Sequence, residues 1–211
     1  MDAPLAARLA QFGAMLLDAN RSTNLTGAQS AQDLAEHLLD SLTLVPYVTA
    51  PLADVGSGGG LPAIVLAIAT GVDMTLIEAT RKKAAFLQRA ARELDVRATV
   101  LAQRAELAAH DAALRGAFGS ATARAVSSAP TVLELTLPFL RPGGRALLQR
   151  GALDAREREA VADAAPMLGG RLAAEVPLEG ERRILIVEKI APTPARFPRR
   201  PGIPEKRPLC Y

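Results

Sequence analysis

The sequence predicts an α/β fold, with a seven-stranded and mostly parallel sheet, a closing antiparallel hairpin and preceding N-terminal helices. From residue 52 onward, short apolar runs alternate with stretches of helical periodicity, as expected where helices connect parallel strands. The last two apolar runs, residues 171–176 and 183–187, are separated by a short polar turn, which favours an antiparallel pair. A glycine-rich loop directly follows the first strand, where open α/β sheets bind ligands.

Two helices are expected before the sheet. In the first, Pro4 suits the opening turn and apolar residues recur at helical spacing as far as Leu17. Ser30 can cap the second helix, whose apolar face runs from Leu34 to Val45. Both helices lie in the part of the chain that precedes the first strand signal.

The remaining elements follow from apolar runs and their spacing. Strands are predicted at residues 52–55, 74–77, 99–102, 121–126, 145–148, 171–176 and 183–187. Helices are predicted at residues 63–69, 81–94, 131–140 and 154–165. Pro142-Gly143-Gly144 is interpreted as a turn that leads into the fifth strand.

The 211 residues are expected to form one domain, with a helical extension (1–48), a core (49–190) and a basic, proline-rich arm (191–211). Apolar residues make up 49% and charged residues 22%, which excludes wholesale disorder. No uncharged apolar run is long enough to span a membrane, and the single cysteine, Cys210, favours a reducing cytoplasm. We expect a monomer. We also expect no metal site, since the two histidines, His37 and His110, stand 73 residues apart and lack the spacing of metal ligands.

The loop after the first strand has the pattern Asp-x-Gly-x-Gly-x-Gly, from Asp54 to Gly60. A dinucleotide fingerprint starting at Gly56 would require a glycine where Leu61 stands. The pattern instead resembles that of S-adenosylmethionine-dependent methyltransferases; a nicotinamide cofactor and a glycine turn without any ligand are the alternatives. Glu78 ends the second strand, 22 residues after Gly56, and suits hydrogen bonds to a ribose diol.

The arm carries five basic residues, one acid and six of the 15 prolines, so its net charge is +4 against −1 for residues 1–190. Its prolines exclude the interior of helices and sheets, and we expect an extended arm. It is either a solvated tail or a cationic arm along a polyanion, in which case Arg199, Arg200, Lys206 and Arg207 contact RNA. Because the glycine loop and Glu78 lie elsewhere in the chain, removal of the arm's five basic side chains is expected to leave cofactor affinity almost unchanged.

Several segments extend this pattern beyond the glycine loop. They are Asn24-Leu25-Thr26, His37-Leu38-Leu39-Asp40-Ser41-Leu42, residues 54–62, Lys82-Lys83 with Phe86-Leu87, Arg104-Ala105-Glu106, Thr122-Ala123-Arg124-Ala125 and residues 197–204. In this order and spacing the chain resembles the ribosomal RNA small subunit methyltransferase G family, also called glucose-inhibited division protein B, over residues 16–209.

The resemblance implies a Rossmann-like class I methyltransferase fold that uses S-adenosylmethionine to methylate N7 of one guanine in the 16S ribosomal RNA of the small subunit. It places Gly56 and Leu61 at the cofactor backbone, Ala105 and Glu106 at the adenine, and Arg124 in the same pocket. Glu78, which ends the second strand, is added to these cofactor-binding residues for the ribose because of its position.

Three positions depart from the family pattern. Gly119 stands where an acid commonly follows the phenylalanine of the fourth strand, and Ala63 stands where glycine usually follows the proline of the loop. Arg150 replaces a lysine before the glycine that follows the fifth strand, and because the two side chains differ in geometry its role is open.

Guanine N7 has an in-plane lone pair and no proton, so its methylation requires no general base and we expect no catalytic acid or base. Aligning the two reactants can contribute about 7–11 kcal/mol to lowering the barrier. Positioning groups are therefore the expected machinery.

Several side chains keep two interpretations. His37 either contacts RNA or cofactor or makes an interhelical hydrogen bond, and Arg124 either grips a carboxylate or phosphate or forms a structural ion pair. The basic segment 81–83 is either a solvated face or a contact to RNA phosphates, and His110 is expected at the surface. The alternative functions are methylation of another RNA, a small molecule or a protein, and a noncatalytic role in RNA binding or ribosome assembly.

Overall fold

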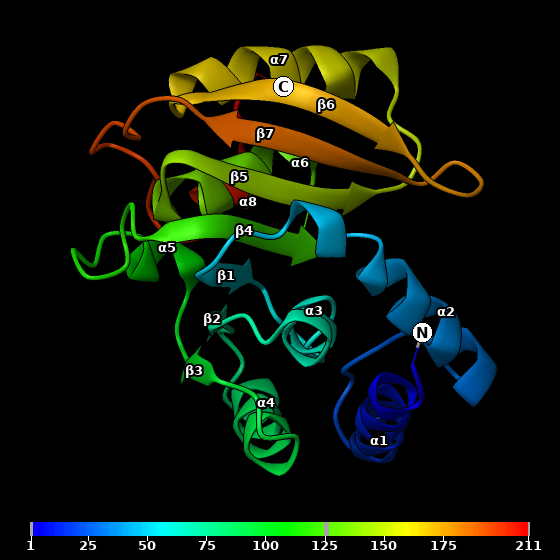
Figure 1. The fold of residues 1–211 in the computed structure, drawn as a ribbon. Coiled ribbons are helices and arrows are strands. Elements are labelled where there is room, and N and C mark those ends of the chain that lie inside the picture. The colour runs from blue at the N-terminus through cyan, green and yellow to red at the C-terminus, as the bar shows by residue number, and fades with distance from the viewer. Residues whose placement is uncertain (1, 125–126, 211) are drawn as a thin grey trace.

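The computed structural model describes residues 2–124 and 127–210. A seven-stranded sheet with the order β3-β2-β1-β4-β5-β7-β6 runs through the centre of the molecule (Figure 1). Its strands are β1 (Leu52–Val55), β2 (Met74–Ile77), β3 (Ala98–Leu101), β4 (Phe118–Arg124), β5 (Leu140–Arg150), β6 (Gly170–Pro177) and β7 (Arg183–Lys189). The first five strands pair in parallel, and β7 pairs antiparallel with both β5 and β6. The predicted α/β fold class and its closing hairpin are confirmed.

Helices cover both faces of the sheet and pack on two separate apolar clusters, because successive strand residues point to opposite faces. On one face lie α1 (Ala3–Asn20), α2 (Ala31–Leu42), α3 (Ala63–Thr70) and α4 (Arg81–Glu93). The other face is covered by α5 (Ala105–Ala108), α6 (Ala129–Thr136) and α7 (Ala155–Met167), and α8 (Ile203–Lys206) packs on α6. Short 3₁₀ turns occur at Val45–Tyr47 and Leu137–Phe139.

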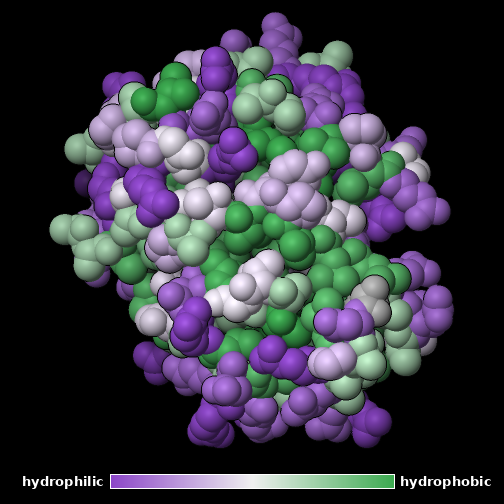
Figure 2. Space-filling model, viewed as in Figure 1, coloured by the Kyte–Doolittle hydropathy of each residue, from purple (hydrophilic) through white to green (hydrophobic). Residues whose placement is uncertain are grey.

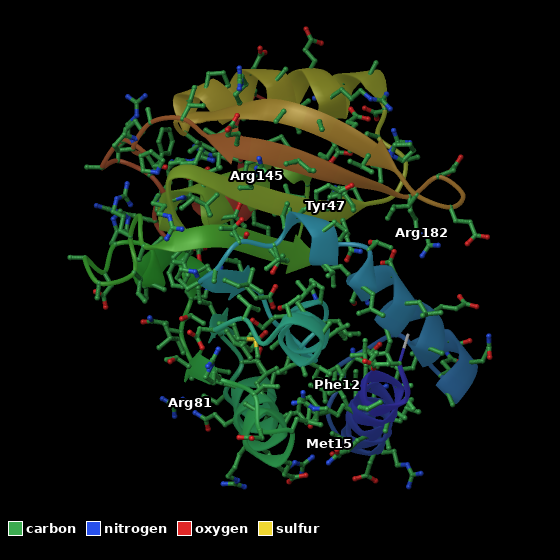
Figure 3. All side chains as sticks on the ribbon, in the orientation of Figure 1. Phe12, Met15, Tyr47, Arg81, Arg145 and Arg182 are labelled. Carbon is green, nitrogen blue, oxygen red and sulfur yellow. The ribbon has the colours of Figure 1, made fainter. Side chains whose placement is uncertain are left out.

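The N-terminal helices belong to the core of the domain. The Asp2 side chain accepts a hydrogen bond from the Leu5 backbone and caps α1, and Ser30 caps α2 as predicted. Phe12 and Leu16 are fully buried, and Phe12 lies where α1 meets α3 (Figure 3). The extension therefore contributes part of the apolar packing of one sheet face.

The start of β5 differs from the prediction. Pro142-Gly143-Gly144 is part of this strand, at an irregularity where the register with β4 shifts between Phe118 and Ser120. A Cβ on Gly144 would lie 2.9–3.1 Å from backbone oxygens, so only glycine fits there. A Cβ on Gly119 would lie 2.5 Å from the carbonyl oxygen of Ala50, which explains why no acid occupies that position.

Other helix and strand boundaries differ from the predicted ones for local reasons. The helix predicted at residues 131–140 ends early because Leu140 already pairs with β4, and α2 ends at Leu42. The short helices α5 and α8 escaped prediction because four residues show no periodicity. Of the predicted fourth strand, Ala125 and Val126 lie outside the described residues, as does Tyr211 of the arm. Within the described part of the chain, no helix is long and apolar enough to cross a membrane.

Candidate functional site

The glycine loop joins β1 to α3 in a conformation that glycine adopts more readily than any other residue. Gly56, Gly58 and Gly60 have φ values of 68°, 53° and 88°, all in the left-handed region. A Cβ on Gly60 would lie 2.6 Å from the side chain of Ile64. The loop thus presents bare backbone at the carboxyl end of β1, at the edge where ligands bind in open α/β sheets.

The segment after α1 packs directly against this loop. The Asn20 side-chain oxygen accepts hydrogen bonds from the backbone N–H groups of Leu25 and Thr26, at 2.8 and 3.0 Å. The carbonyl oxygen of Leu25 then lies 2.8 Å from where a Cβ of Gly59 would be. The motif around Asn24-Leu25-Thr26 therefore supports the glycine loop from the N-terminal side.

Glu78 links the ends of β1 and β2. Its Oε2 accepts a hydrogen bond from the Gly58 backbone at 2.9 Å, and its Oε1 accepts one from the Thr80 backbone at 2.7 Å. Although the side chain is buried, it lines a cavity beside the loop. The contact with a ribose that the sequence predicts stays a prediction, and the structure adds that Glu78 orients the glycine loop.

The first cavity, of about 150 Å³, contains four of the six predicted cofactor residues: Gly56, Glu78, Ala105 and Glu106. Its walls also include the apolar side chains of Val55, Ile77 and Leu135. The combination of apolar walls with a few converging polar groups is typical of a small-molecule site.

Glu106 is a buried carboxylate with two donors on one oxygen. Its Oε1 accepts hydrogen bonds from the backbone N–H of Gly202 at 2.8 Å and from Arg104 Nη2 at 3.1 Å. Burial by itself raises the pKa of Glu106, but the hydrogen bonds, with that from Gly202 first among them, outweigh it and hold the pKa below its usual value. Glu106 is therefore ionised at neutral pH.

A second cavity, of about 630 Å³, lies on the other side of the glycine loop and shares Gly56 with the first. Leu61 and Arg124, the remaining predicted cofactor residues, line it together with His37 and Asp40 of α2. The structure thus distributes the six predicted residues over two adjoining cavities that meet at Gly56.

Asp40 connects three distant parts of the chain at the rim of this second cavity. Its Oδ2 lies 3.5 Å from Arg124 Nη1 and its Oδ1 lies 3.1 Å from Arg182 Nη1. Arg182 follows the turn between β6 and β7 and lies beside α2 (Figure 3). Figure 2 shows the molecule hollowed at its right edge, where a cavity of about 600 Å³ separates the hairpin from α2.

Asp54, the first residue of the glycine-loop motif, is buried behind the loop. Its Oδ1 accepts a hydrogen bond from Thr122 Oγ1 at 2.7 Å, whereas Oδ2 is buried without a hydrogen-bond partner among the described residues. Burial raises the pKa of Asp54 to about 7. An unpartnered carboxylate oxygen of this kind would be stabilised by a cationic group nearby.

The structure shows the surroundings of His37, Arg150 and the basic segment 81–83, whose roles the sequence left open. His37 lines the second cavity, and its ring makes no hydrogen bond within the described part of the chain; burial and then Arg124 lower its pKa. Arg150 donates to the Ser127 carbonyl at 2.5 Å and pairs with Glu157 at 2.7 Å, which is a structural role. Of the basic segment 81–83, Lys83 reaches the second cavity.

The arm is folded onto the domain, so the prediction of an extended arm is wrong. Arg199 forms a bidentate ion pair with the buried carboxylate of Glu134, with contacts of 2.6–3.1 Å, and Phe197 is buried. Glu205, the one acid within the arm, is therefore not the only carboxylate available to the arm's cations. Arg200, Lys206 and Arg207 are exposed, whereas Arg199 would have to give up this ion pair to reach RNA. His110 is at the surface as expected, and its Nε2 lies 2.9 Å from the Pro198 carbonyl.

Comparison with known proteins shows to which family the chain belongs. The model of the rRNA small subunit methyltransferase G family (GidB) matches residues 5–185. The chain belongs to this family. Proteins named ribosomal RNA small subunit methyltransferase G from Rubrobacter xylanophilus and Chloroflexus aggregans are 39% and 43% identical to it. These matches cover 93% and 90% of this chain and 81% and 84% of the relatives.

Solved structures agree on the fold. A Thermus thermophilus 16S rRNA N2 G1207 methyltransferase in complex with AdoMet and guanosine is 20% identical and superposes with a TM-score of 0.51, over 74% of this chain and 40% of that chain. A putative RNA methyltransferase from Pyrococcus horikoshii is 11% identical, with a TM-score of 0.57 over 79% and 89%. At these identities the likeness concerns the fold, and it supports the Rossmann-like methyltransferase architecture predicted for this family member.

Four residues at or behind these cavities were not predicted from the sequence as functional residues. Asp54 and Asp40 stood inside the quoted motifs, so the signal was present and only their roles were missed. Arg182 and Glu205 reach the cavities from the hairpin and from the arm, and no local pattern marks them.

Proposed function

We propose that this protein transfers a methyl group from S-adenosylmethionine to N7 of one specific guanine in 16S ribosomal RNA. The observation that carries the proposal is the pair of cavities meeting at Gly56 in a member of this methyltransferase family. The smaller cavity would receive the adenine, with the ribose beside Glu78 and the glycine loop, and the larger one has room for an amino-acid chain and for an incoming base. The reacting atoms would then meet beside the glycine loop.

The residues present fit this cofactor. Glu106 and Glu78 offer carboxylate oxygens to the donors of adenine and ribose, and Arg124 offers guanidinium donors to a carboxylate. Asp54 is buried behind the glycine loop and lines neither cavity, but its unpartnered Oδ2 would favour a positively charged ligand on the other side of the loop. When bound, S-adenosylmethionine supplies an electrophilic methyl group on a sulfonium sulfur.

The reaction itself makes modest demands on the protein. N7 carries no proton, so the side chains around the second cavity have to align the base and need not abstract anything. As N7 becomes methylated, the guanine ring gains positive charge. The carboxylates of Asp40 and Glu36, which line the second cavity, can stabilise that charge. His37 needs no acid–base role in this scheme.

The RNA would approach along positive side chains next to the two cavities. Lys83 and Arg182 line the larger cavity, and Arg200, Lys206 and Arg207 are exposed on the arm. Contacts from such side chains to phosphates position a nucleic acid without reading its sequence. We further propose that the protein acts in the cytoplasm as a monomer on the small ribosomal subunit and needs no metal.

Methyl transfer measured on three substrates in parallel tests the proposal. Tritiated S-adenosylmethionine is incubated with undermethylated small subunits, naked 16S RNA and total protein, and the RNA is digested for 7-methylguanosine. We expect label in 7-methylguanosine from one site of the 16S RNA. Label in protein, in another RNA or in a different nucleoside would refute the assignment, and binding to subunits without any transfer would indicate a noncatalytic role.

A further inference from the structure

The C-terminal arm, residues 191–210, is fastened to the domain through its backbone. Arg115 donates hydrogen bonds to the carbonyl oxygens of Thr193, Pro194 and Phe197, at 2.8–3.1 Å. Further along, Thr131 Oγ1 donates to the carbonyl oxygen of Pro204 at 2.9 Å. Bonds to the backbone fix the path of the arm independently of most of its side chains.

This path brings the arm to the smaller cavity. The backbone N–H of Gly202 donates to Glu106 Oε1 at 2.8 Å, across 96 residues of sequence. Glu205, in α8, is one of the residues that line the cavity, and Thr131, which holds Pro204, is another. The arm therefore touches the site at two points, although the glycine loop lies far from it in the chain.

We propose that the arm is a working part of the cofactor site, with Gly202 as a positioning residue for Glu106 and α8 as one wall of the adenosine pocket. This inference rests on the proposed function, which assigns Glu106 to the adenine. With Oε1 taken by Gly202 and Arg104, Oε2 is the oxygen left for the amino group of the base. Cofactor affinity then depends on the arm.

The chemistry favours this arrangement. An exocyclic amino group is a donor, so its partner has to be an acceptor that stays ionised and keeps its direction. Burial opposes ionisation of Glu106, and the hydrogen bond from Gly202 is the first of the contacts that lower its pKa again. A shift of the Gly202 backbone would weaken both the charge and the direction of the carboxylate.

Two alanine variants separate this role from a general loss of stability. Gly202 and Gly143 have φ values of 79° and 82°, and a Cβ on either meets nothing within 4 Å. Gly202→Ala and Gly143→Ala therefore impose the same kind of backbone strain, but only the first lies on the bond to Glu106. The ligands are S-adenosylhomocysteine and 5′-methylthioadenosine, which keeps the adenosine and lacks the amino acid.

In calorimetric titrations we expect Gly202→Ala to weaken both ligands by a similar factor, up to about tenfold, as for a hydrogen bond to a charged group. Gly143→Ala should bind both ligands as the wild type does. Equal affinities in the two variants, or a loss confined to S-adenosylhomocysteine, would overturn the inference. If the wild-type protein binds neither ligand, the proposed function fails instead.

Hydrogen exchange on the wild-type protein gives a second test that needs no variant. S-adenosylhomocysteine should slow amide exchange in residues 199–207 of the arm as well as in the glycine loop. The connection between α4 and β3, residues 94–97, also lies outside the helices and strands and lines neither cavity, so it serves as the reference segment. Protection of the glycine loop without any change in residues 199–207 would show that the arm is no wall of the pocket.

Discussion

The two cavities that meet at Gly56 are built in different ways. The smaller one is formed by the ends of β1 and β2, by α5 and by the arm. The hydrogen bonds that Glu78 and Glu106 accept there come from backbone N–H groups, with one more from Arg104 to Glu106. The larger one is bounded by α2, and its rim is held by the ion pairs of Asp40 with Arg124 and Arg182.

This difference suits two tasks. Backbone donors on strand ends are rigid and preorganised, as a site that holds one constant ligand requires. The ion pair of Asp40 with Arg182, whose side chain is about half exposed, contributes little net stability and can exchange partners readily. The larger cavity can therefore rearrange for an incoming base while the smaller one keeps its shape.

The strongest test replaces the residue that both cavities share. Gly56→Val puts a β-branched side chain at a φ of 68°, where the two cavities meet, so we expect methyl transfer and cofactor binding to fall below detection. Gly71→Val is the matched control, since Gly71 has a φ of 69° and its Cβ would meet nothing within 4 Å. Thermal unfolding should show similar destabilisation of both variants. Normal transfer by a folded Gly56→Val variant would show that the cavities are not the site.

Arg124→Ala should affect the larger cavity only. Loss of a charge-assisted contact costs about 1.5–3 kcal/mol, so the affinity for S-adenosylhomocysteine should fall by roughly 10- to 100-fold and transfer should be lost. The affinity for 5′-methylthioadenosine, which lacks the amino acid, should stay unchanged. Equal losses for both ligands would contradict the division of the cofactor between the two cavities.

How much of this division the sequence could predict depends on the range of the contacts. The glycine loop and Glu78 are set by neighbouring strand ends, so their periodic patterns predicted both position and proximity. The pairing of Asp40 with Arg182 spans 142 residues, and that of Glu134 with Arg199 spans 65. No local propensity encodes such pairs, and composition alone suggested a free arm because the buried carboxylate of Glu134 sits within an otherwise ordinary helix.

The prediction of a turn at the start of β5 was wrong for a related reason. Proline and glycines predict a turn wherever the neighbouring strand is unknown. Here β4 pairs on both sides of the irregularity, at Leu140 and again at Arg145, so the segment stays within the sheet. Tertiary pairing therefore decided the structure of Pro142-Gly143-Gly144.

Asp54 gives a smaller and pH-dependent effect. Because burial raises its pKa to about 7, the native state holds a proton that the unfolded chain releases near pH 4, and stability falls as the pH rises between these values. A cationic ligand beside Oδ2 would lower this pKa, so binding should release a proton below pH 7. The affinity for S-adenosylmethionine, which carries the sulfonium charge that S-adenosylhomocysteine lacks, should then rise with pH up to about 7, by at most about tenfold per unit.

Calorimetry in two buffers of different ionisation enthalpy measures the released proton directly. Asp54→Asn should remove both the proton release and the pH dependence of the affinity. Proton release that persists in this variant would assign the titration to another group, such as His37, whose pKa is lowered by burial.

Removing the basic side chains of the arm should have the smallest effect on catalysis at low salt. It should clearly change the salt dependence of binding to the small subunit. Arg200, Lys206 and Arg207 are exposed and were all predicted to meet RNA, whereas Arg199 is held by Glu134. Changing these three to Gln should lower the salt slope of subunit binding by roughly two units, at about 0.7–0.9 per phosphate contact.

The control removes the same charge elsewhere, by changing the exposed Arg21, Arg92 and Arg97 to Gln. Cofactor affinity should stay unchanged in both triple variants, because the arm reaches the smaller cavity through the Gly202 backbone and Glu205, which both variants retain. If the slope falls equally in the two variants, the RNA senses only the net charge. If it falls in neither, the RNA is held on the side of the larger cavity, where Lys83 and Arg182 lie, and the arm's contribution is confined to the cofactor.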